Sequence, residues 1–335
     1  MKLALIGFGT VGQGFVEILR DKSAELEARY GFAPQLVAVA TRSRGTLLLP
    51  DGLDPARLLT AIEAGHFRHY PDAPGLVRDL DVPALIRASG ADVLLEAGPT
   101  DLQTAQPALA YCYAALDQGM HLVLANKGPV AVAYADLQAR ARQAGKRVLF
   151  EGTVMAGTPS LRLAQQALAG CTIQAARGIL NGTTNYILTQ MEGGMSYAEA
   201  LRQAQALGYA EADPTADVDG WDAASKALIL AAALFDRAFT LADLDVQGIA
   251  NITTADIAAA QADGERWKLI AHVTPEGGSV RPQRVSNTHP LAAVGGATNA
   301  VTFTTDLLGD VTLVGPGAGR RQTGFALLAD VLDLL

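Results

Sequence analysis

Residues 2–12 read KLALIGFGTVG, a short apolar run followed at once by glycines in the spacing G-x-G-x-x-G, and a helical pattern then continues to about Arg29. Strand, glycine turn and helix in this order are typical of a dinucleotide-binding unit, because the glycines allow a tight turn and a pyrophosphate lies at the helix N-terminus. A glycine-rich turn without a ligand is the simpler alternative. We expect an N-terminal Rossmann-type domain. Its predicted cofactor contacts are Gly7, Phe8, Gly9, Thr10, Val11 and Gly12.

The next predicted strand, Gln35–Ala40, is followed by Thr41-Arg42-Ser43-Arg44. Enzymes that use NAD usually carry Asp or Glu at this point, where the carboxylate binds the ribose 2′-hydroxyl. Here the carboxylate is missing, and Arg42 can pair with a 2′-phosphate instead. The sequence therefore favours NADP(H). NAD(H) is the alternative if Arg42 and Arg44 are only solvated loop charges.

Two further strands of this domain, Asp92–Ala97 and His121–Ala125, precede polar turns. The first turn holds Thr100 and is expected to start a helix, and the second, Asn126-Lys127-Gly128-Pro129, holds Lys127. Ligands of open α/β sheets bind beyond the carboxyl ends of the strands, so both residues are candidates for cofactor contacts. Thr100 as a helix cap and Lys127 as a surface charge are the alternatives.

The length of 335 residues predicts two domains. We place the cofactor domain at 1–150, with a C-terminal helix at 316–335 that packs back on it, and an α+β substrate-binding and dimerisation domain at 151–315. Residues 46–83 are interpreted as a loop-rich excursion, in which His66 and His69 lack an acidic or cysteine partner for a metal site.

The net charge of −8 argues against a nucleic-acid or membrane-surface partner. Cys112 and Cys171 form neither a disulfide framework nor a metal-ligand spacing, which indicates a reduced compartment. The apolar start lacks the features of a signal peptide, and the longest apolar run, Ala227–Phe235, is too short to span a bilayer. We expect a soluble, cytoplasmic protein.

The second domain carries an acidic stretch at residues 208–226, GYAEADPTADVDGWDAASK, which runs directly into ALILAAALF. A helix starting near Asp219 would place Asp222 and Lys226 one turn apart on one face. Because the rest of that helix is apolar on every side, it should be buried, and a buried ammonium needs a compensating charge. Lys226 is therefore a candidate functional residue. The alternative has Asp219 capping the helix, Asp222 completing a capping box and Lys226 in a surface ion pair.

The remaining segments of this domain predict a sheet with small helices. A strand is expected at 172–180, a polar turn at 181–185, helices at 186–191 and 196–208, and short strands between Phe239 and Phe303. Such a sheet could bind substrate on one face and pair with a second copy on the other. Since most oligomers are symmetric homo-oligomers, we expect a homodimer.

Six motifs in order, GFGTVG, ANKGP, EGTVMAGTP, GILNGTTNYIL, the 208–226 stretch and GPGAG, resemble homoserine dehydrogenase over essentially the whole chain. The resemblance implies NADP(H)-dependent interconversion of L-aspartate 4-semialdehyde and L-homoserine, a step towards threonine, methionine and isoleucine. No aspartate kinase precedes these motifs and no amino-acid-binding module follows them, so feedback control by threonine through such a module is not expected.

The resemblance also implies residue roles. Lys226 is the candidate acid/base and Asp222 holds it, while Lys127 assists at the reacting oxygen or in proton transfer. Glu211 and Asp217 would bind the α-ammonium of the substrate. Gly319, in the final glycine turn, would lie close to the nicotinamide, although that turn could equally be a helix start.

The segment EGTVMAGTP at 151–159 is similar to a turn that holds a monovalent cation, typically sodium, in the resembled family. Hard cations take oxygen ligands, including main-chain carbonyls. Met155 departs from the usual glycine. By position, the implied ligands are Glu151, Val154, Ala156 and Thr158.

Two other functions remain as alternatives. Another Rossmann-type amino-acid dehydrogenase is one, although an aspartate-semialdehyde dehydrogenase would need a nucleophilic cysteine, and neither Cys112 nor Cys171 has a histidine nearby in sequence. A sensor that binds NADP(H) without catalysis is the other, and such a protein should have lost Lys226, Glu211 or Lys127, all of which are present.

Overall fold

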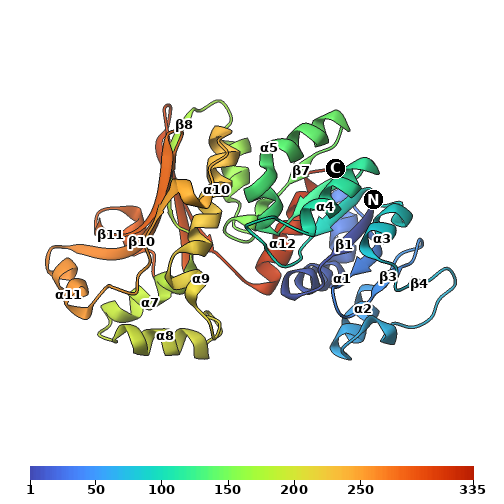
Figure 1. The fold of residues 1–335 in the computed structure, drawn as a ribbon, viewed down its shortest axis with the longest axis horizontal. Helices are drawn as coiled ribbons and strands as arrows, with labels where there is room; N and C mark the ends of the chain where they lie inside the picture. The colour runs from blue at the N-terminus through green and yellow to red at the C-terminus, as the bar shows by residue number, and fades with distance from the viewer. The chain divides into compact units, whose positions relative to one another are not determined.

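The computed structural model describes all residues from 1 to 335, and the chain divides into two compact units. The first contains residues 1–157 and 319–335, and the second contains residues 158–318 (Figure 1). The chain therefore leaves the first unit, completes the second and returns. None of the helices combines the length and apolar character that crossing a bilayer requires.

The first unit is built on a seven-stranded sheet in the order β4-β3-β2-β1-β5-β6-β7. The five parallel strands are β1 Lys2–Ile6, β2 Gln35–Ala40, β5 Val93–Glu96, β6 His121–Leu124 and β7 Val148–Leu149. Two antiparallel strands, β3 Thr46–Leu48 and β4 Val77–Arg78, extend one edge. Because β1 pairs with β2 on one side and β5 on the other, the strand order reverses at β1, which is where such sheets bind ligands. This is the expected Rossmann-type arrangement.

Six helices belong to the first unit: α1 Thr10–Tyr30, α2 Pro55–Glu63, α3 Val82–Ser89, α4 Ala108–Asp117, α5 Lys127–Gln143 and α12 Arg320–Leu332. Helices α1 and α12, from opposite ends of the sequence, pack side by side (Figure 1). Glycine permits this approach, because a Cβ atom at Gly14 would lie 2.0 Å from the main-chain oxygen of Arg320. Leu327, Leu328 and Val331 of α12 enter the same hydrophobic core as Leu3 and Phe15.

One expectation for this unit was incomplete and one was wrong. Residues 46–83 are rich in loops, as predicted, but they also contain β3, β4 and the nine-residue helix α2, whose Asp54 cap accepts a hydrogen bond from Arg57 N at 2.8 Å. The helix expected directly after Thr100 begins only at Ala108. Asp101 instead accepts hydrogen bonds from Gln103 N and Thr104 N, which stabilise a turn within the loop.

The second unit contains a six-stranded sheet in the order β13-β12-β8-β10-β11-β9. Its strands are β8 Ile173–Ile179, β9 Leu244–Val246, β10 Glu265–Thr274, β11 Gly277–Ser286, β12 Thr298–Thr305 and β13 Gly309–Pro316. All neighbours are antiparallel except β9 and β11. Strands β10 and β11 have ten residues each, longer than the short runs expected there.

Six helices complete this unit: α6 Ser160–Arg162, α7 Gly182–Glu192, α8 Tyr197–Ala206, α9 Thr215–Val218, α10 Trp221–Phe235 and α11 Thr254–Ala262. Helices α7, α10 and α11 all pack on β10. Helix α10 is buried without interruption from Ala223 to Ala232, as its apolar sequence predicts.

Candidate functional site

Asn181, the N-cap of α7, joins two carboxylates in the second unit. Its Oδ1 accepts hydrogen bonds from the main-chain N and the hydroxyl of Thr184, at 2.8 and 3.0 Å, which fixes the orientation of the amide. Its Nδ2 therefore faces the other way and donates to Asp217 Oδ1 at 2.6 Å and Asp222 Oδ2 at 2.9 Å. The predicted polar turn at 181–185 is in fact the cap and first turn of a helix.

Lys226 lies on α10 and is only 8% exposed. Its Nζ donates to Asp222 Oδ2 and to the main-chain oxygen of Leu180, each at 2.6 Å. An ammonium group has three N–H donors, so one donor is left for a ligand oxygen. The predicted pairing of Asp222 with a buried Lys226 is therefore present.

The capping part of the alternative interpretation was wrong. The N-cap of α10 is Gly220, whose φ of 90° lies in the left-handed region that glycine adopts without strain. Asp219 instead occupies the C-cap of the preceding helix, α9. Asp222 thus lies in the first turn of α10 and binds Lys226 without serving a capping box.

The other two predicted substrate carboxylates differ in their surroundings. Asp217 is half-buried, and burial raises its pKa, while the hydrogen bond from Asn181 acts against that rise. Glu211 lies in the exposed segment before α9, where its carboxylate makes no hydrogen bond or ion pair. The structure therefore joins Asn181, Asp217, Asp222 and Lys226 in one hydrogen-bond network, to which the Glu211 carboxylate does not belong.

The glycine motif of the first unit forms the tight turn that its sequence predicts. Gly7 has φ 96°, and a Cβ atom there would lie 2.4 Å from the main-chain carbon of Ala97. A Cβ atom on Gly12 would lie 2.2 Å from Gly7 O, so only glycine fits at either position. Gly9 is the N-cap of α1, Phe8 is buried beneath the turn, and Thr10 and Val11 begin the helix.

Beside this turn lies a pocket of about 650 Å³ at the carboxyl ends of β1, β2 and β5. Arg42 and Thr100 both line it, as do Asp79 and Asp81 from the segment between β4 and α3. Arg42 is exposed and makes no ion pair, so its guanidinium can bind a ligand. The pocket thus combines the cationic side chain of Arg42 with several acidic side chains near the place where an adenosine ribose is expected.

Glu96, the last residue of β5, also lines this pocket and was missed from sequence. It is 1% exposed, its Oε1 accepts a hydrogen bond from Gly98 N at 3.0 Å, and its buried Oε2 has no partner. Burial raises the pKa of this carboxyl to about 7, although the nearby amide of Asn126 and the hydrogen bond from Gly98 N act to lower it. The available signal was a carboxylate inside an otherwise apolar strand, which cannot be buried in charged form at low cost.

Lys127 and Gly319 each begin a helix of the first unit. Lys127 is the first residue of α5, and the N-cap Asn126 accepts a hydrogen bond from Gly128 N at 3.0 Å and donates one to Pro99 O at 3.1 Å. Gly319 is the N-cap of α12 with φ 136°, a conformation that other residues rarely adopt.

The four predicted cation ligands lie in or beside a turn of unusual backbone conformation. Met155 and Ala156 are successive residues other than glycine at φ 58° and 51°. Glu151 is buried and its main-chain N donates to Asp330 Oδ2 at 2.9 Å, while Thr158 Oγ1 donates to Pro316 O at 2.9 Å. Val154 and Ala156 are also buried. Nowhere do three or more His, Cys, Asp or Glu side chains gather as metal ligands.

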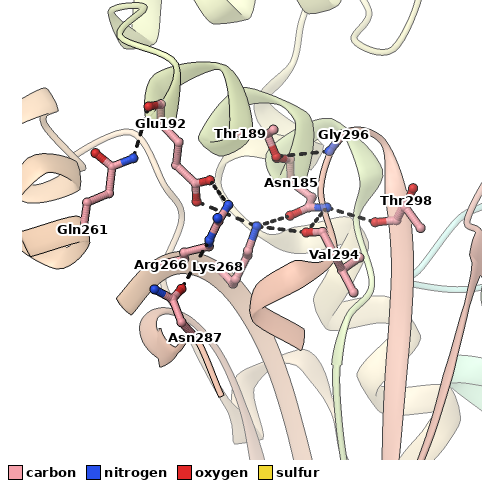
Figure 2. Close-up of polar contacts among 10 residues, drawn as sticks. All are labelled: Asn185, Thr189, Glu192, Gln261, Arg266, Lys268, Asn287, Val294, Gly296 and Thr298. Carbon is pink, nitrogen blue, oxygen red and sulfur yellow. Dashed lines mark hydrogen bonds and ion pairs between the residues drawn. The ribbon is translucent and has the colours of Figure 1, made fainter. Parts of the chain in front are cut away.

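A second buried lysine, Lys268 on β10, was not found from sequence. Figure 2 shows its Nζ among oxygen atoms of α7 and the segment after η5 Pro290–Ala293: Val294 O at 2.9 Å, Asn185 Oδ1 at 3.3 Å and Glu192 Oε1 at 3.9 Å. Asn185 Nδ2 in turn donates to Val294 O and Thr298 O. Burial lowers the pKa of Lys268. These contacts tie α7, and with it the Asn181 cap, to the loop before β12.

Comparison with known proteins agrees with this geometry. Residues 7–151 match the family model "Homoserine dehydrogenase, NAD binding domain", and residues 159–332 match the model "Homoserine dehydrogenase". An NAD(+)-dependent homoserine dehydrogenase of Pseudomonas canavaninivorans is 45% identical over 99% of this chain and 96% of its own length.

Solved structures show the same relationship. A crystal structure from Archaeoglobus fulgidus, assigned as a homoserine dehydrogenase, superposes with a TM-score of 0.90 at 36% identity, over 100% of this chain and 99% of its own. A hyperthermophilic archaeal homoserine dehydrogenase in complex with NADPH gives 0.85 at 29% identity, over 99% and 96% of the two chains. The chain therefore belongs to the homoserine dehydrogenase family of NAD(P)-dependent oxidoreductases, which act on a CH–OH group.

Proposed function

We propose that the chain interconverts L-aspartate 4-semialdehyde and L-homoserine, as a step towards threonine, methionine and isoleucine, and that Lys226 is its acid/base. The observation that carries the role of Lys226 is the buried ammonium with two of its donors held by Asp222 and Leu180 O. A nicotinamide cofactor supplies or accepts the hydride. Lys226 acts at the oxygen of the reacting carbon, where negative charge develops during reduction.

The surrounding groups favour this role. Asp222, less than a quarter exposed, orients the ammonium of Lys226, and Asn181 Nδ2 donates to the same Asp222 oxygen, Oδ2. Asp217 shares the same amide, and together with Glu211 we assign it to the α-ammonium of the substrate. Lys127 is proposed to assist at the reacting oxygen or in proton transfer.

The cofactor preference rests on opposing charges in one pocket. Arg42 favours a 2′-phosphate and hence NADP(H). Asp79 lines the same pocket, and a Cβ atom on Gly45 would come within 3.5 Å of its carboxylate, which is therefore close to the loop that holds Arg42. A carboxylate there suits the 2′-hydroxyl of NAD(H), and the Pseudomonas relative is described as NAD(+)-dependent. We propose NADP(H) as the preferred cofactor and NAD(H) as a second one.

Replacing these two charges tests the preference. Arg42→Ala should raise KM for NADP about 10-fold or more and leave KM for NAD within about twofold, because it removes a charge-assisted hydrogen bond of about 1.5–3 kcal/mol to the 2′-phosphate alone. Asp79→Asn is the matched variant and should raise KM for NAD more than KM for NADP. Equal changes for both cofactors in Arg42→Ala would remove the 2′-phosphate assignment.

We further propose that the 151–158 turn holds a monovalent cation through the residues Glu151, Val154, Ala156 and Thr158. Successive left-handed residues such as Met155 and Ala156 cost on the order of 1 kcal/mol or more each, so the surroundings must fix this backbone. Main-chain oxygens are ligands that hard cations prefer, and the buried carboxyl groups of Glu151 and Asp330 add further oxygen atoms beside the turn. We also propose that the chain forms a homodimer through the sheet of the second unit, and that it is located in the cytoplasm.

The decisive experiment follows absorbance of the reduced nicotinamide with L-homoserine as substrate, with NADP and NAD in separate assays and sodium or potassium present. Reduction that requires homoserine is the expected result, and the ratio of the two rates measures the cofactor preference. If cofactor binds but neither is reduced, the chain acts on another amino acid or serves as a sensor.

A further inference from the structure

Glu96 occupies the point of the first sheet where the strand order reverses. It is the last residue of β5, which pairs with β1 directly before the glycine turn. Its side chain reaches the same pocket as Arg42, yet only Oε1 is hydrogen-bonded, to Gly98 N at 3.0 Å. Oε2 is buried and has no partner. An unpaired polar atom in such a position normally costs free energy, so its retention points to a ligand.

The groups around Glu96 provide no counter-ion. The side chains that face it are the amide of Asn126, the thiol of Cys112 and the phenol of Tyr111, and burial raises the pKa of both the thiol and the phenol, with the Glu96 charge adding to the rise. The charged residues elsewhere in the pocket lining are Arg42, Asp79, Asp81 and Asp101. An ionised Glu96 would thus be a buried anion without a cationic partner, in a pocket where a dinucleotide brings further negative charge.

Resting on the proposed cofactor use, we propose that Glu96 binds the dinucleotide as a neutral acid, with Oε2–H donating a hydrogen bond to an uncharged acceptor on the adenosine half. Such an acceptor is a ribose oxygen or a ring nitrogen. The adenosine half is assigned because the pocket also contains Arg42. A carboxylic acid kept neutral by its surroundings is an effective donor at neutral pH.

This role couples cofactor binding to a proton. Below pH 7 the free protein already carries the proton, since the pKa of Glu96 is about 7, and binding needs no uptake. Above pH 7 each binding event takes up a proton, so the dissociation constant rises by up to about tenfold per pH unit. Binding therefore weakens with pH, whereas a Glu96 that accepted hydrogen bonds as a carboxylate would give the opposite sign.

NADH is the suitable probe, because its pyrophosphate stays ionised throughout, whereas a 2′-phosphate like that of NADPH titrates near about pH 6. Its dissociation constant is measured by fluorescence titration between about pH 6 and about pH 9. The wild type should lose about 10- to 100-fold in affinity over this range. Glu96→Gln, which keeps a neutral donor, should bind with an affinity that hardly changes with pH. Tyr111→Phe, which removes one of the two other titratable groups that face the carboxyl, should keep the wild-type slope.

A second measurement uses the unaltered protein and tests the proposal even if Glu96→Gln fails to fold. Calorimetry of NADH binding near about pH 8, in two buffers of different ionisation enthalpy, should show uptake of close to one proton. A dissociation constant that is flat or falls with pH, or the absence of proton uptake, overturns the role of Glu96 while leaving cofactor use intact. Absence of NADH binding at every pH, with the protein folded, overturns the proposed cofactor use as well.

Discussion

At the scale of single residues, Lys226 offers the sharpest test of the chemistry. Lys226→Ala should lower kcat by about 10²–10⁴-fold, because in the mechanism that we propose the variant loses the proton donor and the charge that faces the developing oxyanion. The dissociation constant for NADPH should change little, since the glycine turn and the Arg42 pocket both belong to the first unit. Turnover and fluorescence titration measure the two quantities separately.

Lys226→Arg is the matched control, because it keeps the positive charge but holds its proton too tightly to donate it. Activity restored by Arg would mean that Lys226 acts by charge alone. Full activity in Lys226→Ala would remove this residue from the mechanism.

The buried carboxyl of Glu96 should also shape the stability of the free protein. Its pKa rises from 4.5 to about 7 on folding, so the folded state binds more protons than the unfolded state between these values, and the free energy of unfolding falls as pH rises through that window. The loss is on the order of 3 kcal/mol. In urea denaturation, Glu96→Gln should not show this pH-dependent loss, so the variant should be more stable than the wild type above pH 7. Glu63→Gln, at an exposed position, is the control and should show the same pH dependence as the wild type.

The residues that sequence could predict are those whose partners are close in the chain. Asp222 and Lys226 lie one helical turn apart, so their ion pair follows from helix geometry. The amide of Asn181 meets Asp217 and Asp222 across 36 and 41 residues, and no local pattern reports such a contact. Glu96 was missed for a related reason. The free-energy cost of burying its carboxyl depends on whether another segment supplies a counter-ion, and the local sequence does not show this.

At the scale of elements, Lys268 links β10 to α7 and to the loop before β12. Lys268→Met should lower the free energy of unfolding by about 2–4 kcal/mol, because it removes the donor of Asn185 Oδ1, one of the two donors of Val294 O, and the buried positive charge that faces Glu192 Oε1. Both tryptophans, Trp221 and Trp267, lie in the second unit, so their fluorescence in urea reports this transition directly.

Arg266→Met is the matched control. Arg266 pairs with the other oxygen of the same Glu192 at 2.8 Å, but its side chain is 45% exposed, so its loss should cost no more than about 1 kcal/mol. If both variants lost a similar amount of free energy of unfolding, burial would not make the Lys268 contacts more stabilising than the exposed Arg266 ion pair.

Element prediction succeeded where periodicity and glycines agreed. Strands β1 and β2 have the predicted bounds, and α1 follows the glycine turn as expected. Helix α2 was overlooked although Asp54 and Pro55 form a recognisable start, because the surrounding prolines and histidines indicated loop. Strands β10 and β11 were predicted too short, since Lys268 and Pro282 interrupt their apolar pattern and only the paired sheet accommodates them.

At the scale of the whole molecule, α12 returns to the first unit after the second is complete. Leu327 is fully buried in the core of the first unit, so Leu327→Ala should destabilise that unit by about 2–5 kcal/mol. The two units then unfold in separate steps: far-UV circular dichroism should show an earlier transition, while tryptophan fluorescence should be unchanged. Leu335→Ala, at a residue 64% exposed, is the control. A parallel shift of both signals would mean that the units unfold together.

The return of α12 also sets an order for folding during synthesis. Residues 158–318 must leave the ribosome before Leu327, Leu328 and Val331 can cover Leu3 and Phe15. At about 5–20 residues per second, the nascent first unit waits on the order of ten to thirty seconds with apolar surface uncovered. The second unit is contiguous in the chain, so it can complete its core as soon as it has emerged, and the part of the protein that is translated first is the last to be finished.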